Sequence, residues 1–146
     1  MNIIESITNL YENVLPKCTV MLPHDEAIQY FERLMMNGNI ITYVKDGELC
    51  GFLEYWRCSY EQFGRICANM TLSHEEDLLN GEVALITRMW IIHDLRNGEA
   101  FLNMGREFLS KNITATHYAA MQFHKVHKPI QIYSREQILK HYRMEN

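Results

Sequence analysis

The spacing of apolar residues changes from a helical to a β period at residue 40, and this change constrains the fold more than any other feature of the sequence. Residues 24–37 carry apolar side chains on one helical face, and the glycine at position 38 favours the left-handed cap that ends a helix. Residues 40–44 and 49–56 are β-rich runs, and Lys45-Asp46-Gly47 between them is a hairpin signal. Strands joined by such a short turn must be antiparallel neighbours, so the sequence predicts a helix followed by a β-hairpin.

Periodic segments on both sides of this hairpin extend the prediction to a whole α/β (α+β) domain. They are a helix over 2–15, a strong strand over 82–92, a helix over 99–111, strands over 114–123 and 130–133, and a last helix capped by Ser134. Residues 57–71 fit a short helix or a packed loop, and Ser73-His74-Glu75-Glu76 is a helix-capping pattern. A strand–helix–strand unit beside a hairpin predicts a mixed, mostly antiparallel central sheet flanked by helices, in a single domain over 1–146.

Length and composition are those of an ordinary globular protein. The 146 residues suffice for one hydrophobic core, and 47% hydrophobic with 22% charged residues are typical values. No run of 18 apolar residues is present, so we expect no membrane-spanning helix. Residues 1–6 lack a basic region and include Glu5, so we expect no secretory signal and a cytoplasmic location.

The four cysteines do not have the spacing of a zinc site. Cys18, Cys50, Cys58 and Cys67 contain no C-x-x-C pair, and His74 is the one histidine close to them in the sequence. Zinc ligands usually come in close pairs, because one turn can then present both to the metal. We therefore expect no metal and interpret the cysteines as buried or partly buried free thiols.

The net charge of −4 is unevenly distributed along the chain. Residues 1–110 contain 8 Lys/Arg and 16 Asp/Glu, whereas residues 111–146 contain 6 Lys/Arg and 2 Asp/Glu, with four histidines besides. This segregation is compatible with a phosphate-bearing ligand or nucleic acid and, more simply, with a solvated basic surface. Residues 123–135 interleave aromatic and basic side chains, which suits phosphate binding or base stacking but also an edge strand protected by lysine and proline.

The loop between the strand over 82–92 and the helix over 99–111 is the most informative stretch. It reads Ile91-Ile92-His93-Asp94-Leu95-Arg96-Asn97-Gly98-Glu99-Ala100. A strand that ends in a glycine-containing loop and opens a helix presents unpaired backbone N–H groups, and the helix dipole adds partial positive charge. Glycine lets an anionic ligand come close to the main chain. The loop therefore predicts a diphosphate cradle, with an ordinary strand-to-helix turn as the alternative interpretation.

The element order and this loop resemble the GCN5-related N-acetyltransferase (GNAT) superfamily over about residues 24–133. That superfamily binds the pyrophosphate of acyl-CoA through a Gln/Arg-x-x-Gly-x-Gly/Ala loop, and Gly98 and Ala100 match its last two positions. Leu95 stands at the first position, Arg96 lies one residue late, and Glu99 adds a carboxylate. The resemblance implies a GNAT-like acyl-CoA N-acyltransferase fold with acetyl-CoA or another acyl-CoA as cofactor. The implied cofactor-binding residues are Ile91, Ile92, Leu95, Arg96, Asn97, Gly98, Glu99 and Ala100.

Within that superfamily the sequence is also distantly similar to the toxin-activating lysine acyltransferases. Those enzymes lack the usual loop motif and use an N-terminal histidine together with an aspartate on the central strand. His24 lies at a comparable place, and Trp90, Asn97 and Gly98 match residues around the loop, while the place of the aspartate falls on Met89. This resemblance implies a catalytic role for His24.

Acyl transfer to an amine needs a base for the ammonium, a donor to the thioester carbonyl and an acid for the departing thiolate. His93 and Asp94 stand at the end of the central strand, where α/β sheets bind ligands, although they also suit a polar loop or a helix cap. Glu54 alternates with its neighbours Leu53 and Tyr55, so we expect it to face the other side of the strand, most simply toward solvent. The predicted catalytic residues are His93, Asp94, Glu54, Tyr133 and His24.

Tyrosines and histidines in the last third of the chain have simpler interpretations as well. Tyr118 and Tyr133 are candidates for protonating a thiolate, but strand tyrosines usually pack on the sheet. His117, His124 and His127 do not have the spacing of a recognised metal site, so we interpret them as surface residues.

Three functions are compatible with these observations. The first is acyl-CoA-dependent N-acylation of an amine, either a small molecule or a protein. The second is a catalytically inactive GNAT-like binding or interaction protein of a phage or mobile element. The third is nucleic-acid binding through the basic last third, which the overall acidity argues against. Membranes are not expected as partners, and two exposed strand edges are compatible with a homodimer.

Overall fold

The structure is a computed structural model, which describes residues 2–15, 21–69, 80–93, 98–120 and 131–142. Five strands form one sheet in the order β1-β2-β3-β4-β5. Strand β1 pairs with β2 and β4 with β5 in antiparallel fashion, whereas β3 and β4 are parallel, so the predicted mixed, mostly antiparallel sheet is confirmed. In chain order the elements are α1 (Ile3–Asn13), α2 (His24–Asn37), β1 (Ile40–Lys45), β2 (Glu48–Cys58), α3 (Tyr60–Asn69), β3 (Val83–Ile91), α4 (Glu99–Lys111), β4 (His117–Ala120), β5 (Gln131–Ser134) and α5 (Arg135–Tyr142).

Most predicted elements match the observed ones closely, one open alternative is decided, and one strand begins later than predicted. The ambiguous segment over 57–71 contains a helix, α3. The strand predicted to begin at Thr114 begins at His117, because residues 112–114 form a turn in which the buried Asn112 accepts a hydrogen bond from the N–H of Ala115 (3.0 Å). The capping pattern over 73–76 lies outside the described residues.

The described residues group into two compact units. Unit 1 comprises residues 1–54 and 88–107, and unit 2 comprises residues 55–87 and 108–146. Strands β2 and β3 and helix α4 run through both units. The assignment of a single domain over 1–146 stays a prediction.

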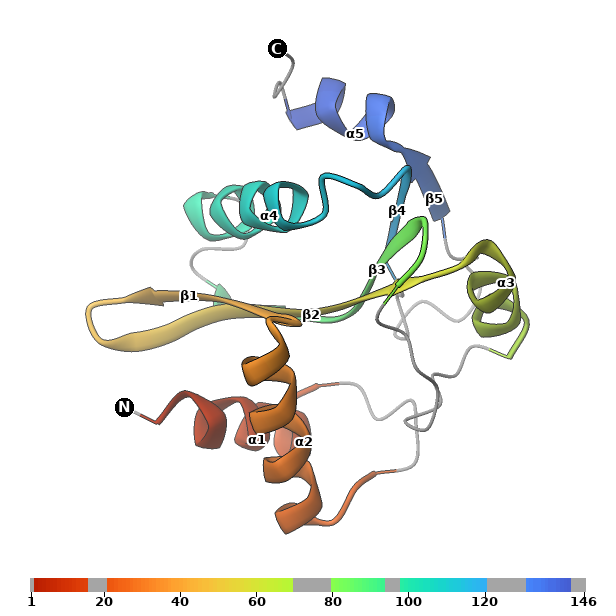
Figure 1. The fold of residues 1–146 in the computed structure, drawn as a ribbon. Helices are drawn as coiled ribbons and strands as arrows, with labels where there is room; N and C mark the ends of the chain where they lie inside the picture. Colours follow the sequence, from red (N-terminus) through yellow and green to blue (C-terminus); the bar gives the residue numbers. More distant parts are fainter. Residues whose placement is uncertain (1, 16–20, 70–79, 94–97, 121–130, 143–146) are drawn as a thin grey trace. The chain divides into compact units, whose positions relative to one another are not determined.

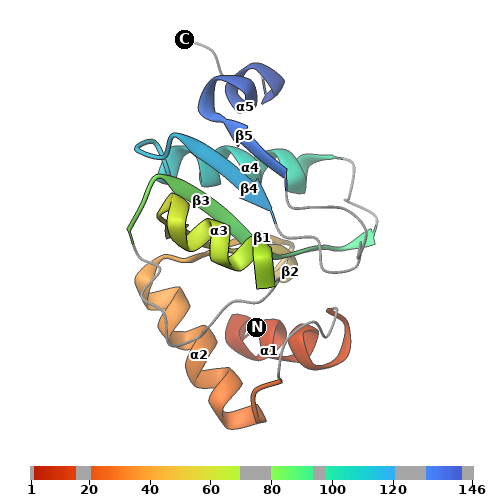
Figure 2. The same ribbon diagram turned by 90° about the vertical axis from the view of Figure 1, so that its right-hand side faces the viewer.

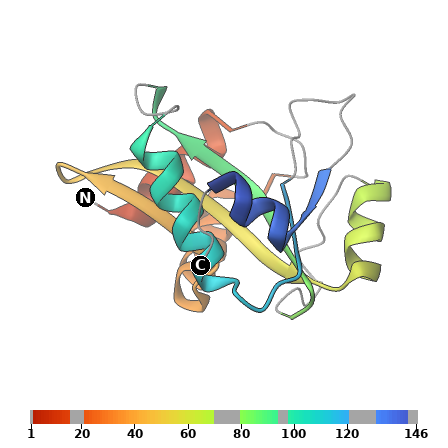
Figure 3. The ribbon, with the colours of Figure 1, turned by 90° about the horizontal axis from the view of Figure 1, so that it is seen from above.

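In unit 1 the β1–β2 hairpin is covered on both faces. Helices α1 and α2 lie on one face and α4 on the other (Figure 1), and from above α4 is seen to cross the hairpin (Figure 3). Gly51 on β2 allows this close approach, because a Cβ there would lie 3.0 Å from the methyl carbon of Met104 and 3.2 Å from the backbone oxygen of Trp90. The strand residues between the helices are consequently buried on both sides.

Helices α1 and α2 pack together through an apolar seam. Ile7 and Phe31 have no exposed surface, and the rings of Tyr11 and Phe31 meet edge to face with centroids 5.4 Å apart. The predicted stop of α2 is confirmed: Gly38 adopts the left-handed conformation with φ of 75° and donates its N–H to the backbone oxygen of Met35.

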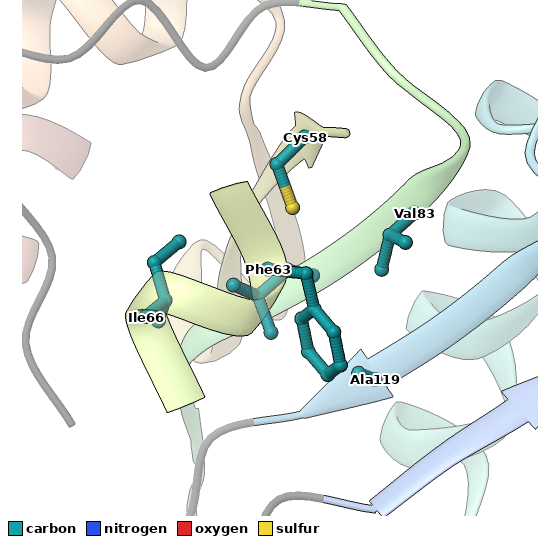
Figure 4. Close-up of a cluster of buried hydrophobic side chains, with 6 residues drawn as sticks. Cys58, Phe63, Ile66, Val83 and Ala119 are labelled. Carbon is teal, nitrogen blue, oxygen red and sulfur yellow. The ribbon is translucent and has the colours of Figure 1, made fainter. Parts of the chain in front are cut away.

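In unit 2 helix α3 packs on strand residues through a small buried cluster. Figure 4 shows how Phe63 and Ile66 of α3 lie among the strand side chains, and Figure 2 shows α3 alongside β3. This buried face explains why residues 60–69 form a helix rather than a loop. The cluster consists of Cys58, Phe63, Ile66, Val83, Leu85 and Ala119.

The beginning of β3 in unit 2 requires a glycine at position 81. Gly81 has φ of +148°, and a Cβ there would lie 2.0 Å from the carbonyl carbon of Cys58. The Arg57 guanidinium donates from Nε (3.0 Å) and Nη2 (2.5 Å) to the Gly81 carbonyl and from Nη1 to Thr114 Oγ1 (3.0 Å). These bonds hold the turn against the end of β2.

Helix α5 follows β5 directly and begins as predicted at Ser134. The Ser134 hydroxyl accepts a hydrogen bond from the N–H of Gln137 (3.3 Å), and the Gln137 side chain accepts one from the N–H of Ser134 (2.8 Å). This reciprocal arrangement is a capping box.

The described cysteines are free thiols. Cys50 and Cys58 are buried and Cys67 is partly buried, as predicted, while Cys18 lies outside the described residues. The described residues contain no group of three or more His, Cys, Asp or Glu that could hold a metal ion. None of the described helices combines the length and apolar character needed to cross a lipid bilayer.

Candidate functional site

The helix α4 begins at the place where the loop sequence predicts accessible backbone N–H groups. Glu99 is the first residue of the helix, and the Gly98 carbonyl accepts the N–H of Leu102 (3.3 Å). The N–H groups of Gly98, Glu99 and Ala100 have no hydrogen-bond partner among the residues that the structure describes. The helix dipole places partial positive charge at this end. Gly98 and Glu99 therefore form a candidate anion cradle, while Ala100 is fully buried and its predicted contact with the cofactor is not supported.

The described atoms leave space beside the backbone of Gly98. A Cβ built on Gly98 meets no atom within 4 Å, so the space beside the main chain is unfilled by the described protein atoms. The N–H of Ile92, just past β3, instead bonds to the Cys50 carbonyl (2.8 Å), and Ile91 and Ala100 are buried. Ile91 and Ala100 therefore support the cradle from below. The predicted contacts of Asp94, Leu95, Arg96 and Asn97 lie outside the described residues.

The carboxylate of Glu99 is held by strand β1. Its Oε1 lies 2.5 Å from the ammonium of Lys45, and the Tyr43 hydroxyl also hydrogen-bonds to it. Hydrogen bonds from Lys45 and Tyr43 keep the pKa of the Glu99 carboxyl below its ordinary value. The same bond from Lys45 raises the pKa of that lysine. Glu99 is therefore an ionised group with a cation of its own, at the first turn of α4.

Glu54 lies in the protein interior, so its interpretation as a solvent-facing carboxylate is wrong. From one face of β2 the Glu54 carboxylate reaches the Tyr30 hydroxyl of α2, and its orientation opposite to Leu53 stays a prediction. That face is covered by α1 and α2, and Glu54 consequently has no exposed surface. The sequence pattern of alternation cannot reveal a second covering layer.

The Glu54 carboxylate is satisfied by two partners. Arg88 of β3 donates from Nη1 to Oε2 (2.5 Å), and the Tyr30 hydroxyl of α2 donates to Oε1 (2.6 Å). The Arg88 guanidinium also lies over the rings of Tyr11 and Tyr30, 5.2 Å and 5.8 Å from their centroids. Two aromatic faces and a carboxylate thus surround this buried cation.

Burial and charge decide the protonation states in this cluster. Burial, reinforced by the neighbouring Glu54 carboxylate, raises the pKa of Tyr30, so its hydroxyl stays protonated and donates. Burial opposes the charged form of Arg88, but Glu54 and Tyr30 more than offset this and its pKa lies above the ordinary value. The cluster therefore consists of the neutral Tyr30 hydroxyl and the Glu54–Arg88 ion pair. A buried pair that is satisfied in this way favours a structural role.

His24 lies at the start of α2 and contacts α1. Its Nδ1 is 2.9 Å and 3.1 Å from the two carboxylate oxygens of Glu12. A carboxylate accepts, so Nδ1 carries the proton and Nε2 of a neutral ring is left as the acceptor. The ring is well exposed, at 61%, and an oriented, accessible imidazole of this kind can accept a proton from a substrate.

The other predicted catalytic residues lie in separate places. His93 is exposed and follows β3, whereas Asp94 lies outside the described residues. Tyr133 is on β5, opposite Tyr118 in the β4–β5 register, and is 42% exposed. The Tyr118 hydroxyl is engaged inside unit 2, donating to the Asn112 carbonyl (2.9 Å) and contacting Arg135, and burial raises its pKa.

A polar cluster in unit 2 was not anticipated from the sequence. The Tyr60 hydroxyl of α3 lies 2.6 Å from Nδ1 of His117 and 3.0 Å from Oγ1 of Thr116, and the two latter atoms are 3.0 Å apart. His117 was interpreted as a surface residue, and it is only half-buried. The contact joins residues 57 positions apart, which no local pattern can predict.

The partners of the predicted site residues were missed in the same way. Arg88 interrupts an apolar run on a central strand, and that interruption is a signal from which a buried ion pair could have been inferred. Lys45 and Glu12 carry no such signal, because lysine and glutamate are ordinary on a hairpin turn and a helix surface.

No family model and none of the curated protein sequences matches the chain. Solved structures do match in fold. The GphF GNAT-like decarboxylase in complex with isobutyryl-CoA is 12% identical, with 80% of this chain and 60% of that chain covered and a TM-score of 0.53. The loading GNATL domain of CurA from Lyngbya majuscula is 13% identical, with 80% and 58% covered and a TM-score of 0.54.

A third solved structure is less similar in fold. The ribosomal-protein-alanine N-acetyltransferase from Brucella melitensis is 12% identical, with 80% of this chain and 64% of that chain covered and a TM-score of 0.48. The chain thus spans about three fifths of the length of these solved chains. At identities this low the likeness shows the fold alone, and the chain has the GNAT-like fold that its sequence resemblance implied. The resemblance to toxin-activating lysine acyltransferases is not tested by these structures and stays a prediction.

Proposed function

We propose that this chain binds an acyl-CoA with the diphosphate at the start of α4 and transfers the acyl group to an amine. The observation that carries the proposal is the pair of N–H groups of Gly98 and Glu99, which have no partner among the described residues, beside a space at Gly98 that the described atoms leave unfilled. The GNAT-like fold supports it, since one solved chain of this fold holds isobutyryl-CoA. Acetyl-CoA or another acyl-CoA is accordingly the proposed cofactor.

The cradle has the chemistry that a diphosphate requires. The backbone N–H groups of Gly98 and Glu99 can donate to phosphate oxygens, and the helix dipole favours the negative charge, whereas Ala100 is fully buried. Glycine at position 98 adds no side chain of its own between the ligand and these amides. Ile91, Ile92, Leu95, Arg96 and Asn97 complete the proposed cofactor-binding segment.

Acyl transfer would then fall to groups that a substrate can reach. His24 is exposed, and Glu12 orients its ring, so we assign it the role of general base for the amine. Tyr133 is half-exposed on β5 of unit 2, and its role as the acid for the thiolate stays a prediction from the sequence. Glu54 has no exposed surface and both its oxygens are bonded, so it supports the fold instead.

His93 and Asp94 are better suited to the cradle than to the chemical step. They precede Gly98 by only a few residues, and the pantetheine arm of CoA separates the diphosphate from the thioester. A group beside the diphosphate is therefore remote from the bond that breaks. We assign His93 to phosphate binding, and the role of Asp94 stays a prediction from the sequence.

A second candidate function is an inactive GNAT-like binding protein, such as one from a phage or mobile element. The carboxylate of Glu99 at the cradle favours it, because a fixed negative charge opposes a diphosphate. The fold by itself does not decide between these functions, and one solved chain of this fold is a decarboxylase. The amine acceptor, a homodimer and a cytoplasmic location also remain predictions.

Titration with acetyl-CoA and isobutyryl-CoA by calorimetry and thermal shift tests the proposal. We expect saturable binding, with a melting temperature that rises with ligand concentration. No heat and no shift at millimolar concentration of either ligand would remove it. Mass spectrometry of the reaction with a panel of amines then separates the candidates: an acylated amine supports transfer, and bound but unchanged acyl-CoA supports the inactive binding protein.

A further inference from the structure

The Lys45–Glu99 ion pair joins the end of β1 to the first turn of α4. Both side chains are about half-exposed, at 47% and 46%, and their charged atoms are 2.5 Å apart. The Tyr43 hydroxyl, from the same strand, also donates to the Glu99 carboxylate. Glu99 thus places an anion of the protein's own in the first turn of α4, where the N–H groups of Gly98 and Glu99 have no partner among the described residues.

A carboxylate and a phosphate present similar acceptors to the same donors. Both offer two or more charged oxygens to N–H, O–H and ammonium groups, and both are favoured by the positive end of a helix. A phosphate bound at the start of α4 would therefore also attract the ammonium of Lys45. Its long side chain gives the ammonium freedom to change partner.

Exchange of partners at Lys45 would disturb little else. Exposed ion pairs contribute little to stability, so separating this one costs little free energy. Glu99 is already half in solvent, so release from Lys45 leaves it hydrated rather than buried and unpaired.

We propose that Lys45 is a phosphate-binding residue and that Glu99 is an internal competitor for it. When the diphosphate of an acyl-CoA binds at the start of α4, the Lys45 ammonium leaves Glu99 and pairs with a phosphate oxygen, and Glu99 turns to water. This inference rests on the proposed function, and it adds a residue from the β1–β2 hairpin to the cofactor site.

The variants Glu99→Gln and Lys45→Met test the inference because they act in opposite directions. Removing the competitor should tighten the binding of CoA and of inorganic pyrophosphate by up to about fivefold, whereas removing the cation should weaken both by a similar factor or more. Pantetheine, which lacks the diphosphate, should show no change with either variant. The gain in affinity from Glu99→Gln should be smaller in a protein that also carries Lys45→Met, because residue 99 and the phosphate then no longer compete for the lysine.

Glu48→Gln is the matched control. Glu48 is the register partner of Lys45 across the hairpin and is exposed, so its neutralisation changes the local charge equally without touching the pair. We expect no more than a small change in CoA affinity from this variant. Calorimetry at one fixed ionic strength gives the affinities, and thermal melting confirms that each variant is folded.

The outcomes separate this inference from the function on which it rests. If wild-type protein binds CoA and Glu99→Gln leaves the affinity unchanged or weakens it, or if Lys45→Met binds as well as wild type, the competition is wrong and the proposed function stands. If folded wild-type protein and folded Glu99→Gln both fail to bind CoA and pyrophosphate at millimolar concentration, both are wrong.

Discussion

Glu54 and Arg88 form an ion pair of 2.5 Å between neighbouring strands, in a place where Glu54 has no exposed surface and Arg88 is only 14% exposed. Tyr30 supplies the second hydrogen bond to the carboxylate, and Tyr11 and Tyr30 stack on the guanidinium. The pair links the α1–α2 layer of unit 1 to the strands beneath it. Its energetic role follows from the cost of a buried charge that has lost its partner.

Removing one member of this pair should destabilise the protein far more than replacing both. We expect Glu54→Ala to lower the free energy of unfolding by about 3–5 kcal/mol, because Arg88 is left charged and unpaired. Glu54→Met combined with Arg88→Met should lose much less, since two apolar side chains of similar volume fill the same space. Urea unfolding measures both, and equal losses in the single and double variants would contradict this account.

A side chain at Gly98 should block the proposed cofactor without harming the fold. A Cβ at this position meets no described atom within 4 Å, so Gly98→Val should fold, yet its side chain stands where phosphate must approach. We expect CoA affinity to fall by at least about tenfold, or about 1.4 kcal/mol. Gly64→Val is the control, because Gly64 on α3 is equally open. If both variants bind CoA alike, the cradle is elsewhere.

Gly81 should tolerate no side chain at all. An alanine Cβ would lie 2.0 Å from the Cys58 carbonyl carbon, so the backbone must shift, and we expect a loss of about 3 kcal/mol or more. Gly47→Ala provides the comparison: its φ of +78° is strained for alanine, but its Cβ would have no close neighbour, so we expect a loss of only about 1 kcal/mol. Thermal melts of the two variants should therefore differ clearly, and similar melting temperatures would show that contact is not the cause.

The Lys45–Glu99 pair should stabilise the folded protein only within a defined range of pH. The pKa of Glu99 is lowered in the folded protein, so its stabilising effect is present above the ordinary carboxyl value of 4.5 and disappears as pH falls through the lower folded value. The pKa of Lys45 is raised, so the effect is also lost as pH rises above 10.5 through the folded value. Melting curves of wild type and Glu99→Gln should differ near pH 7 and converge once the pH has fallen below the lowered folded pKa of Glu99. A difference that persists there would mean that the pair is not its source.

His24 should affect the rate of transfer and not the affinity for acyl-CoA. If it is the base, His24→Gln should lower kcat about a hundredfold or more and leave the KM for acyl-CoA near its wild-type value. Glu12→Gln should lower kcat less, because the ring loses its orienting carboxylate but keeps its basic nitrogen. His117→Gln, in the polar cluster of unit 2, is the control and should leave kcat unchanged. Equal rates for His24→Gln and wild type would remove the assigned role.

The elements whose signals are local were predicted well from the sequence. Helix α2 ends at Gly38 because this glycine adopts the left-handed conformation that caps a helix. The hairpin turn over 45–47 and the cap at Ser134 likewise depend on residues only a few positions apart. The position of α4, with Gly98 at its start, was predicted for the same reason. Periodicity and capping act over one or two turns, so they are written in short stretches of sequence.

What surrounds Glu54 and Glu99 was decided only by the tertiary structure. The alternation along β2 indicated which way Glu54 points, but the helices that cover that face come from residues 3–37, and its cation Arg88 is 34 positions away. Lys45 and Glu99 are 54 positions apart, and neither carries a local sign of the other. Sequence alone determined the secondary structure and predicted the side of the strand, because those follow from backbone periodicity. The partner of each charged side chain depends on which surfaces pack against one another. That packing is determined by the tertiary structure of the chain and not by local sequence.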